Sequence, residues 1–357
     1  MRIPVTKPFL PSRGRYKEMV DQIWDSKWLT NNGVFLMRFE RELQLFLGTS
    51  HASVVTSGTI ALQLALKTLE PGGEIITSPF SYVATTSAIV WEGFKPIFAD
   101  IEENSLCIDP AEVERKITSQ TKAILATHVY GNPCNIEELE RISAKHKIPL
   151  FFDGAHAFGA TYGGKSVLEY GDISILSFHA TKLFHTVNGG AVFCKSAEGK
   201  KRIDRFRNFG HEGVNEFNGV GINGKMCEFH SAMGLLNLET AAELIDRRRA
   251  QWKFYRKGIK GSELKTISLS DDKGYNGAYF PVIFPDTSKL QKAIDSATTK
   301  GIELRRYFNP SLNKLDYVEY QPCPVSEDIS ERICCLPQYH ELTNKEQMEV
   351  LELILSV

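Results

Sequence analysis

The sequence predicts an α/β protein: a larger domain with a mostly parallel central sheet covered by helices on both faces, then a smaller C-terminal α+β domain. The length of 357 residues suggests two domains. From residue 52, short apolar segments alternate with helical ones, which is the pattern of a parallel sheet buried on both faces. A charged helical stretch, "LIDRRRAQWKFYRKG", then leads into the C-terminal part. The expected domains are residues 1–245, including an N-terminal arm, and 246–357.

The expected elements follow from apolar runs and their spacing. The segment through "WLTNNG" at 28–33 is polar and turn-rich, so we expect an arm or lid there rather than core. Strands are expected at 53–56, 74–77, 96–98, 123–127, 150–152, 173–178 and 191–194. Helices are expected at 59–69, 83–91, 110–116 and 136–146.

Composition excludes several classes of protein. The formal net charge of −1 lacks the basic excess of a nucleic-acid-binding protein. No apolar run is long enough to span a membrane, and the first residues lack the apolar stretch of a signal peptide. The seven cysteines contain no C-x-x-C pair, so neither a disulfide framework nor a metal site is indicated. We therefore expect a cytoplasmic protein without a metal.

A turn suited to an anion follows the first expected strand. In "TSGT", Gly58 allows backbone amides to approach a phosphate at the start of a helix, and the hydroxyl of Thr59 adds a donor. The alternative is a plain N-cap formed by Ser57 or Thr59, which the turn on its own favours. Because ligands of open α/β sheets bind at the carboxyl ends of the strands, the position itself suits a binding site.

Two more strand ends carry ionisable groups. Asp153 follows an apolar run, where a poorly solvated carboxylate needs a cation or a strong donor. Its partner is either a protonated pyridine nitrogen or a structural group such as a helix cap or salt bridge. His156 lies three residues later and is within reach of the same ligand, although a lone histidine is more often a packed residue.

Lys182 lies in "SFHATKLFHTVNGG", a loop between two apolar strands. An amine in a partly dry pocket has a lowered pKa and is the group that forms Schiff bases. Ser177 and His179 are close to it in sequence. A phosphate-binding turn, a pyridinium carboxylate and a Schiff-base lysine are the three anchors that pyridoxal phosphate requires, and here they occur in order at strand ends.

With these residues in place, the chain resembles the DegT/DnrJ/EryC1/StrS family of sugar-nucleotide aminotransferases, a branch of the aspartate-aminotransferase-like (fold type I) group. The resemblance covers nearly the whole chain. It rests on "PVTKPFLP", "WLTNNG", "TSGTIALQLAL", "HVYGNPCN", "DGAHAFGA", "SFHATKLFHTVNGGAVF", "GINGKMCEFHSAMGL" and "CLPQYHELT". It implies pyridoxal 5'-phosphate as cofactor and a homodimer with shared active sites.

The resemblance also implies roles for individual residues. Lys182 is the lysine that binds the cofactor covalently and shuttles the proton. Asp153 pairs with the pyridine nitrogen, and His156 lies near the ring hydroxyl. Tyr82 stacks on the ring. The phosphate is held by Gly58, Thr59 and Ser177, together with Asn223 from the neighbouring subunit.

The implied substrates are L-glutamate as donor and a nucleotide-linked keto-sugar as acceptor. The motifs are most similar to the branch that acts on dTDP-4-keto-6-deoxy-D-glucose and forms dTDP-4-amino-4,6-dideoxy-D-glucose. Other dTDP or UDP keto-sugars, aminated at C3 or C4, remain alternatives. Arg305 and Arg306 suit the diphosphate, or form a solvated pair. The candidates for the sugar side are Thr30, Asn31, His185 and Tyr307.

Two residues depart from the family pattern. Asn188 stands where many members carry a glutamate, and Asn309 replaces the second tyrosine of a "YFYP" element. Both departures put family contacts at the sugar site in doubt.

Other functions fit the sequence less well. Sugar 3-dehydratases of this type replace the lysine with histidine, whereas Lys182 is present. A non-catalytic regulator is expected to lose Lys182 or Asp153. A nicotinamide-dependent oxidoreductase needs a G-x-G-x-x-G turn, and none follows the first strand.

Overall fold

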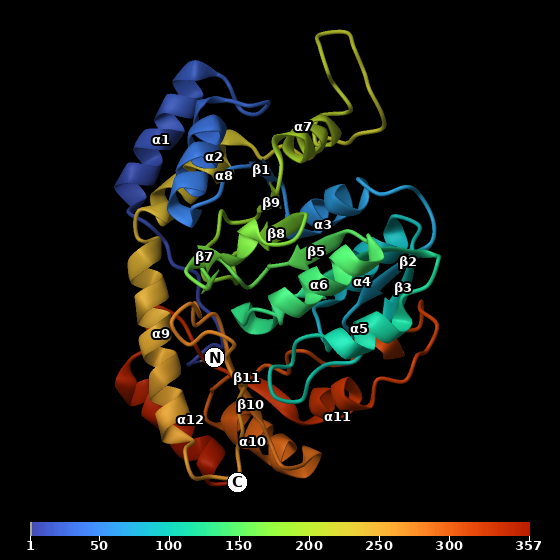
Figure 1. Cartoon of the computed structure of the whole chain (residues 1–357). Helices are drawn as coiled ribbons and strands as arrows, with labels where there is room; N and C mark the ends of the chain where they lie inside the picture. Colours follow the sequence, from blue (N-terminus) through green and yellow to red (C-terminus); the bar gives the residue numbers. More distant parts are fainter. Residues whose placement is uncertain (1) are drawn as a thin grey trace.

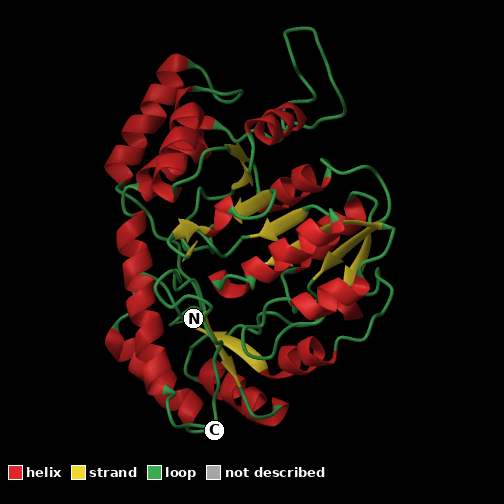
Figure 2. Ribbon diagram, in the orientation of Figure 1, coloured by secondary structure: helices red, strands yellow, loops and turns green. Residues whose placement is uncertain are grey.

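The computed structural model describes residues 2–357 and has an α/β architecture with helices on both faces of a central sheet (Figure 2). In this range, seven strands form the sheet in the order β1-β9-β8-β5-β4-β2-β3. Only β9 runs antiparallel to its neighbours, so the expectation of a mostly parallel sheet is confirmed. The strands of this sheet are β1 (Ala52–Val55), β2 (Glu74–Thr77), β3 (Lys95–Phe98), β4 (Thr121–Thr127), β5 (Leu150–Asp153), β8 (Ile173–Ser177) and β9 (Gly190–Cys194).

The helices alternate with these strands and then continue into the C-terminal part (Figure 1). The larger part contains α1 (Arg13–Ser26), α2 (Val34–Leu47), α3 (Gly58–Leu66), α4 (Val83–Trp91), α5 (Pro110–Lys116), α6 (Ile136–His146), α7 (Ala197–Phe206) and α8 (Glu228–Leu238). After them come α9 (Ala241–Gly258), α10 (Thr287–Thr299), α11 (Pro324–Arg332) and α12 (Asn344–Leu355). Short strand pairs are β6 (Thr161–Tyr162) with β7 (Lys165–Ser166), and β10 (Phe280–Ile283) with β11 (Ile333–Leu336).

Consecutive residues of the central strands enter two different cores, because side chains alternate across a strand. Phe151 packs with α3, α4 and α7 on one face, whereas Phe152 packs with α2, α6 and α8 on the other. Ile75 and Ile76 divide in the same way. Burial on both faces explains why these strands are apolar throughout.

The expectation that the segment before residue 33 is an arm or lid rather than core is wrong for α1. This helix buries Met19 and Ile23, which are four residues apart and therefore lie on one face. That face packs against α8, which is just over 200 residues further along the chain. The remaining side chains of α1 are mostly polar and exposed, so composition alone conceals the buried stripe.

Glu228 fixes the start of α2. Its carboxylate accepts hydrogen bonds from the amides of Phe35 and Leu36, at 2.8 and 2.9 Å, and only 2% of the residue is exposed. The preceding N-cap position is Gly33, which offers no side chain, and a Cβ there would lie 2.4 Å from the Glu228 carboxyl carbon. Glu228 therefore caps α2 from a distant part of the chain.

The proposed domain boundary after residue 245 lies inside α9. Ala241 and Ile245 belong to the larger hydrophobic core, whereas Trp252 and Tyr255 pack with β10, α10 and α12 in a second core. A division within this helix remains a proposal, since the helix itself is continuous. None of the helices in residues 2–357 combines the length and apolarity needed to cross a membrane.

Candidate active site

A cavity of about 280 Å³ lies at the carboxyl ends of the parallel strands. Its lining comes from segments that are up to 250 residues apart in sequence. This placement agrees with the general position of ligand sites in open α/β sheets. Of the residues predicted from the sequence, those lining it are Gly58, Thr59, Tyr82, Asp153, Ser177, Lys182 and Tyr307. Thr85, His179, Asn188 and Arg305 line it as well.

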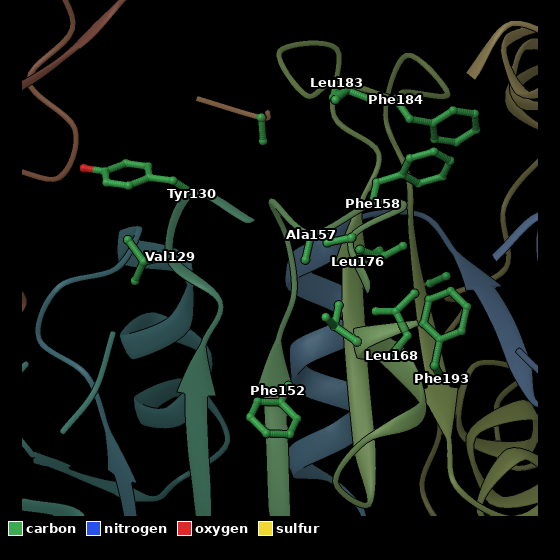
Figure 3. Packing of buried hydrophobic residues seen from close by; sticks show 14 of the residues in the cluster. Val129, Tyr130, Phe152, Ala157, Phe158, Leu168, Leu176, Leu183, Phe184 and Phe193 are labelled. Atoms are coloured by element: carbon green, nitrogen blue, oxygen red, sulfur yellow. The ribbon is translucent and has the colours of Figure 1, made fainter. Parts of the chain in front are cut away.

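The loop that carries Lys182 is held by aromatic packing and backbone hydrogen bonds. The ring of Phe184 stacks on Phe158 with centroids 4.2 Å apart, and Figure 3 shows Leu183 and Phe184 from this loop beside Phe158. The amide of Phe178 donates to the Gly189 carbonyl at 2.8 Å, which closes the base of the loop. The backbone that carries Lys182 is therefore held by contacts on both sides of the lysine.

Lys182 is partly exposed as a whole residue, but protein atoms surround its amine closely enough to change its pKa. Burial lowers the pKa of Lys182 to about 8. The negative charge of Asp153 opposes this shift, and the positive charge of Arg305 adds to it. A lysine whose pKa is about 8 has a substantial neutral fraction near neutral pH, so it can act as a nucleophile and as a base.

Asp153 is the last residue of β5 and is almost fully buried. Burial raises the pKa of its carboxyl, while hydrogen bonds from Thr85 and from the amide of Ala155 act in the opposite direction. Thr85 Oγ1 donates to Oδ2 at 2.7 Å, and the Ala155 amide donates to Oδ1 at 3.0 Å. A carboxylate buried in this way favours a cationic partner.

The start of α3 forms the other end of the cavity. Ser57 Oγ accepts from the amide of Ile60 at 3.2 Å, so the N-cap interpretation is correct for Ser57. Gly58 and Thr59 are the first residues of α3 and line the cavity. The first amides of a helix have no acceptor within the helix, so this end of α3 is suited to an anion. A Cβ on Gly58 would lie 2.8 Å from the Cβ of Ser177, so only glycine fits here without displacement.

His156 is buried and is not among the residues that line the cavity. Its ring centroid is 5.6 Å from that of Tyr307 and 4.6 Å from that of Tyr279. Burial lowers the pKa of His156 well below its usual value, and the charges of Lys182 and Arg305 lower it further. Within residues 2–357, its Nδ1 atom is buried without a hydrogen-bond partner.

Besides His156, four predicted site residues lie outside the cavity lining. His185 is buried, and its ring nitrogens contact the Phe9 carbonyl at 2.7 Å and the Val187 amide at 3.1 Å. The other three are Thr30 and Asn31 in the turn before α2, and Asn223 in the segment before α8. Their roles remain predictions.

Of the two departures from the family pattern, one reaches the cavity. Asn188 lines it. Asn309 instead donates through Nδ2 to the Ser330 carbonyl at 3.0 Å and is not among the lining residues. Any effect on the sugar site is therefore expected from Asn188 first.

Thr85 is a site residue that sequence reasoning missed. The signal available was a hydroxyl residue in the first turn of the helix at 83–91, three residues after Tyr82. The sequence indicates only Tyr82 in this turn, because the proximity of Thr85 to Asp153 depends on how β4 lies between β2 and β5.

These residues fit pyridoxal phosphate. Asp153 is a buried carboxylate suited to a protonated ring nitrogen, the start of α3 is suited to a phosphate, and Lys182 is a nucleophile of lowered pKa. Among residues 2–357, no group of His, Cys, Asp or Glu is arranged to hold a metal ion. The fold and the cavity together define an enzyme of the pyridoxal-phosphate aminotransferase class.

Comparison with known proteins specifies the family. A model of the DegT/DnrJ/EryC1/StrS aminotransferase family matches residues 12–355, and the chain belongs to that family. It is 38% identical to the dTDP-4-amino-4,6-dideoxy-D-glucose transaminase of Shigella dysenteriae, over 99% of this chain and 97% of the relative. The transaminase of the same name from Escherichia coli is 35% identical, over 99% and 98%. The structure of DesI in the presence of its TDP-sugar product matches with a TM-score of 0.92 at 30% identity, over 99% of this chain and 92% of that one.

Proposed function

We propose that the protein transfers the amino group of L-glutamate to C4 of dTDP-4-keto-6-deoxy-D-glucose, giving dTDP-4-amino-4,6-dideoxy-D-glucose. The observation that carries this proposal is the full-length similarity to two transaminases named for that amino sugar, at 38% and 35% identity. Lys182 and Asp153 in one cavity support it, because transamination needs both an amine and a buried carboxylate there.

The proposed roles of the cavity residues follow from their chemistry. When bound, pyridoxal phosphate supplies an aldehyde that receives the amino group and a ring that accepts electrons. Asp153 keeps the ring nitrogen protonated. Gly58, Thr59 and Ser177 hold the phosphate at the start of α3, and Tyr82 stacks on the ring.

Lys182 Nζ carries the protons of the reaction. It binds the cofactor in the resting enzyme, takes up the proton that leaves Cα of glutamate, and later delivers a proton at C4 of the sugar. Its lowered pKa suits both directions, since a group that titrates near the working pH acts equally well as base and as acid.

A homodimer is part of this proposal. Large apolar side chains are exposed around the turn before α2 and in the segment between α7 and α8, which projects from the molecule (Figure 1). These two regions are neighbours, because Asn32 shares a surface hollow with Arg205 and His211. Exposed apolar surface of this extent is typical of protein interfaces. The side chains concerned are Trp24, Trp28, Leu29, Val34, Met37, Phe209, Val214, Phe217, Val220 and Ile222.

In such a dimer, Asn223 is proposed to reach the phosphate in the active site of the other subunit. Its place within this exposed segment supports this, since Asn223 is itself exposed and forms a β-bridge with Asn208. Sedimentation analysis is expected to give twice the mass of the chain, and a monomer at micromolar concentration would contradict this part of the proposal. A cytoplasmic location remains a prediction from the sequence.

Product analysis tests the proposed function. The purified protein is incubated with pyridoxal phosphate, L-glutamate and dTDP-4-keto-6-deoxy-D-glucose, and the nucleotide sugar is identified by mass spectrometry and NMR. We expect a 4-amino-4,6-dideoxyhexose and an equal amount of 2-oxoglutarate. Amination of a UDP-linked keto-sugar, with no reaction of the dTDP sugar, would replace the proposed acceptor. A deoxygenated sugar without nitrogen would indicate a dehydratase instead.

A further inference from the structure

The loop that carries Lys182 ends in a turn with a strained residue. Val187 has a φ of 67°, which is the left-handed region of the backbone. A β-branched residue adopts this region rarely, because its Cβ crowds the following carbonyl oxygen. Val187 is 44% exposed, so packing of its own side chain does not explain the conformation. Contacts of its backbone must therefore hold Val187 in this state.

The side chain that contacts this backbone is His185. Its Nδ1 accepts a hydrogen bond from the Val187 amide at 3.1 Å, and its Nε2 lies 2.7 Å from the Phe9 carbonyl. An amide N–H only donates and a carbonyl only accepts, so these partners define the neutral tautomer with the proton on Nε2. Burial lowers the pKa of His185, which favours the neutral ring. The ring therefore joins Val187 to the segment before α1.

His185 is itself held by distant segments. Its carbonyl accepts from Nδ2 of Asn237 in α8 at 2.8 Å, and Asn237 is buried. The ring of Phe9 packs edge-on against His340, with centroids 5.1 Å apart. The hydrogen bond to Val187 is thus made by a residue that α8 and the segment before α1 both support.

The conformation of Val187 determines where Asn188 lies. Asn188 lines the cavity, and its carbonyl accepts from Thr186 Oγ1 at 3.0 Å. On the other side, a Cβ on Gly189 would lie 2.2 Å from Thr186 Oγ1, so the chain packs closely there as well. A change of φ at Val187 would redirect Asn188, since the backbone has only two soft torsions per residue. Within residues 2–357, the side-chain amide of Asn188 makes no hydrogen bond.

We propose that His185 is a positioning residue that offsets the strain at Val187 and so holds the Asn188 amide against the sugar of the acceptor. This inference rests on the proposed function and adds residues that place a polar group for the acceptor. The cofactor phosphate, ring nitrogen and aldehyde already have proposed partners in α3, Asp153 and Lys182, so the amide is left for a substrate. An amide both donates and accepts, which matches a sugar hydroxyl, whereas the carboxylates of glutamate are bound most strongly by cations.

A double-mutant cycle separates positioning from direct contact. If His185 acts through Val187, its hydrogen bond matters only while residue 187 resists the left-handed conformation, and glycine does not resist it. Wild type, His185→Gln, Val187→Gly and the double variant are prepared as holoenzymes. The absorption of the bound cofactor is followed while the dTDP-amino-sugar is added, which drives the acceptor half-reaction in reverse. The same measurement is made with L-glutamate.

For His185→Gln, we expect the half-saturating concentration of the dTDP-amino-sugar to rise by roughly 10-fold, because the buried Val187 amide loses its acceptor. The glutamate half-reaction should change much less. The amide of glutamine lies near the position of Nε2, so the bond to Phe9 is kept. In the Val187→Gly background, the same substitution should change the half-saturating concentration by no more than roughly twofold.

Further variants provide matched controls. In His185→Asn the amide lies near the position of Nδ1, so the acceptor for Val187 is kept and most of the response to the amino-sugar should be retained. Asn188→Ala should weaken that response at least as much as His185→Gln, with little further loss when both are combined. Lys147→Gly relieves a left-handed residue, φ 56°, at the end of α6 and outside the cavity lining. Combined with His185→Gln, it should not restore the response.

Thermal unfolding tests the strain without any substrate. His185→Gln should lower the unfolding temperature more in the wild-type background than in the Val187→Gly background. Equal losses in the two backgrounds would contradict the compensation of strain.

Three kinetic outcomes would overturn the inference. The first is an unchanged response to the amino-sugar in His185→Gln. The second is a loss that persists in the Val187→Gly background, which would assign His185 itself to the sugar. The third is an equal loss in both half-reactions, which would indicate general disruption. If wild type reacts with glutamate and not with the dTDP-amino-sugar, the proposed acceptor is wrong, and thermal unfolding still decides the role of His185 at Val187. If wild type fails to react with glutamate, the proposed function is wrong and the role of Asn188 with it.

Discussion

Thr85 Oγ1 donates a hydrogen bond to Asp153 Oδ2 at 2.7 Å, joining the first turn of α4 to the end of β5. The hydroxyl of Thr85 is in turn 2.8 Å from that of Ser81, and Thr127 donates to Ser81 at 3.1 Å. All four residues are buried. The carboxylate at the centre of the proposed chemistry is thus the end of a short chain of hydroxyl groups. The chain stabilises the charged form of Asp153 against burial.

Replacing Thr85 should weaken catalysis without removing the cofactor. In Thr85→Val the hydrogen bond is lost at nearly constant side-chain volume, so the pKa of Asp153 rises further. The carboxylate then stabilises the protonated ring nitrogen of the cofactor less strongly. A hydrogen bond to a charged group contributes about 1.5–3 kcal/mol, which corresponds to roughly a 10- to 150-fold lower rate. Steady-state transamination measures the loss. Thr85→Ser keeps the hydroxyl and should retain most of the rate; equal rates in Thr85→Val and wild type would contradict the role of this bond.

Lys182→Ala should abolish covalent attachment of the cofactor and turnover. No other amine lines the cavity among residues 2–357, so no substitute nucleophile is at hand. The absorption spectrum of the variant with added pyridoxal phosphate measures attachment, and product formation measures turnover. The control is Lys195→Ala, which removes an exposed lysine after β9. Turnover in Lys182→Ala at a wild-type rate would contradict the catalytic role of Lys182.

Covalent capture of the cofactor should depend on pH with a midpoint near 8. Only the neutral amine reacts, and burial lowers the pKa of Lys182 to about 8, so the capture rate of cofactor-free protein should rise with pH and level off above that value. An exposed lysine would titrate near 10.5. The charge of Asp153 raises the pKa of Lys182, so Asp153→Asn should move the midpoint to lower pH. Stopped-flow absorption gives both midpoints, and a shift to higher pH in Asp153→Asn would be inconsistent with this electrostatic picture.

Gly58→Ala should weaken binding of the cofactor. The added Cβ would lie 2.8 Å from the Ser177 Cβ and 3.2 Å from its Cα, so either α3 or β8 must shift at the proposed phosphate site. Overpacking of this kind costs about 1–3 kcal/mol, and we expect roughly 10- to 100-fold weaker retention of the cofactor. Equilibrium dialysis against free pyridoxal phosphate measures it. Gly14→Ala, in α1, is the control, because the nearest atom to its Cβ is Ser12 Oγ at 3.9 Å.

Glu228→Ala should destabilise the fold while leaving the cavity residues in place. The substitution removes both acceptors at the start of α2, and loss of a helix cap costs about 2 kcal/mol at the upper end of measured values. Thermal unfolding should therefore begin several degrees lower. Glu18→Ala, on the exposed face of α1, should leave the transition unchanged. An unchanged transition in Glu228→Ala would show that α2 does not depend on this cap.

The sheet and its helices could be predicted where local signals and burial agree. The helices at 83–91, 110–116 and 136–146 have the predicted bounds, and two of them begin at side-chain caps, Asp109 and Asn135. The strands shift by one or two residues at their ends, because an apolar run does not mark where pairing stops. The first strand, expected at 53–56, lies at Ala52–Val55.

What the sequence could not provide were contacts between distant segments. The helix α1 is stabilised by packing on α8, which its own polar composition does not reveal. Thr85 lies close to Asp153 because a single strand, β4, separates β2, which precedes α4, from β5, which ends at Asp153. The sequence does not distinguish Arg305 from Arg306 as a diphosphate ligand. The structure does, because Arg305 lines the cavity and Arg306 donates to the Glu331 carboxylate.

The central claim is that Lys182 and Asp153 hold one cofactor that takes the amino group from glutamate and passes it to the keto-sugar. The most direct measurement is the visible absorption spectrum of the holoenzyme, recorded alone, after L-glutamate, and after subsequent dTDP-4-keto-6-deoxy-D-glucose. We predict a band that disappears with glutamate and returns with the keto-sugar. The claim would be contradicted by a protein that shows no such band even after addition of pyridoxal phosphate.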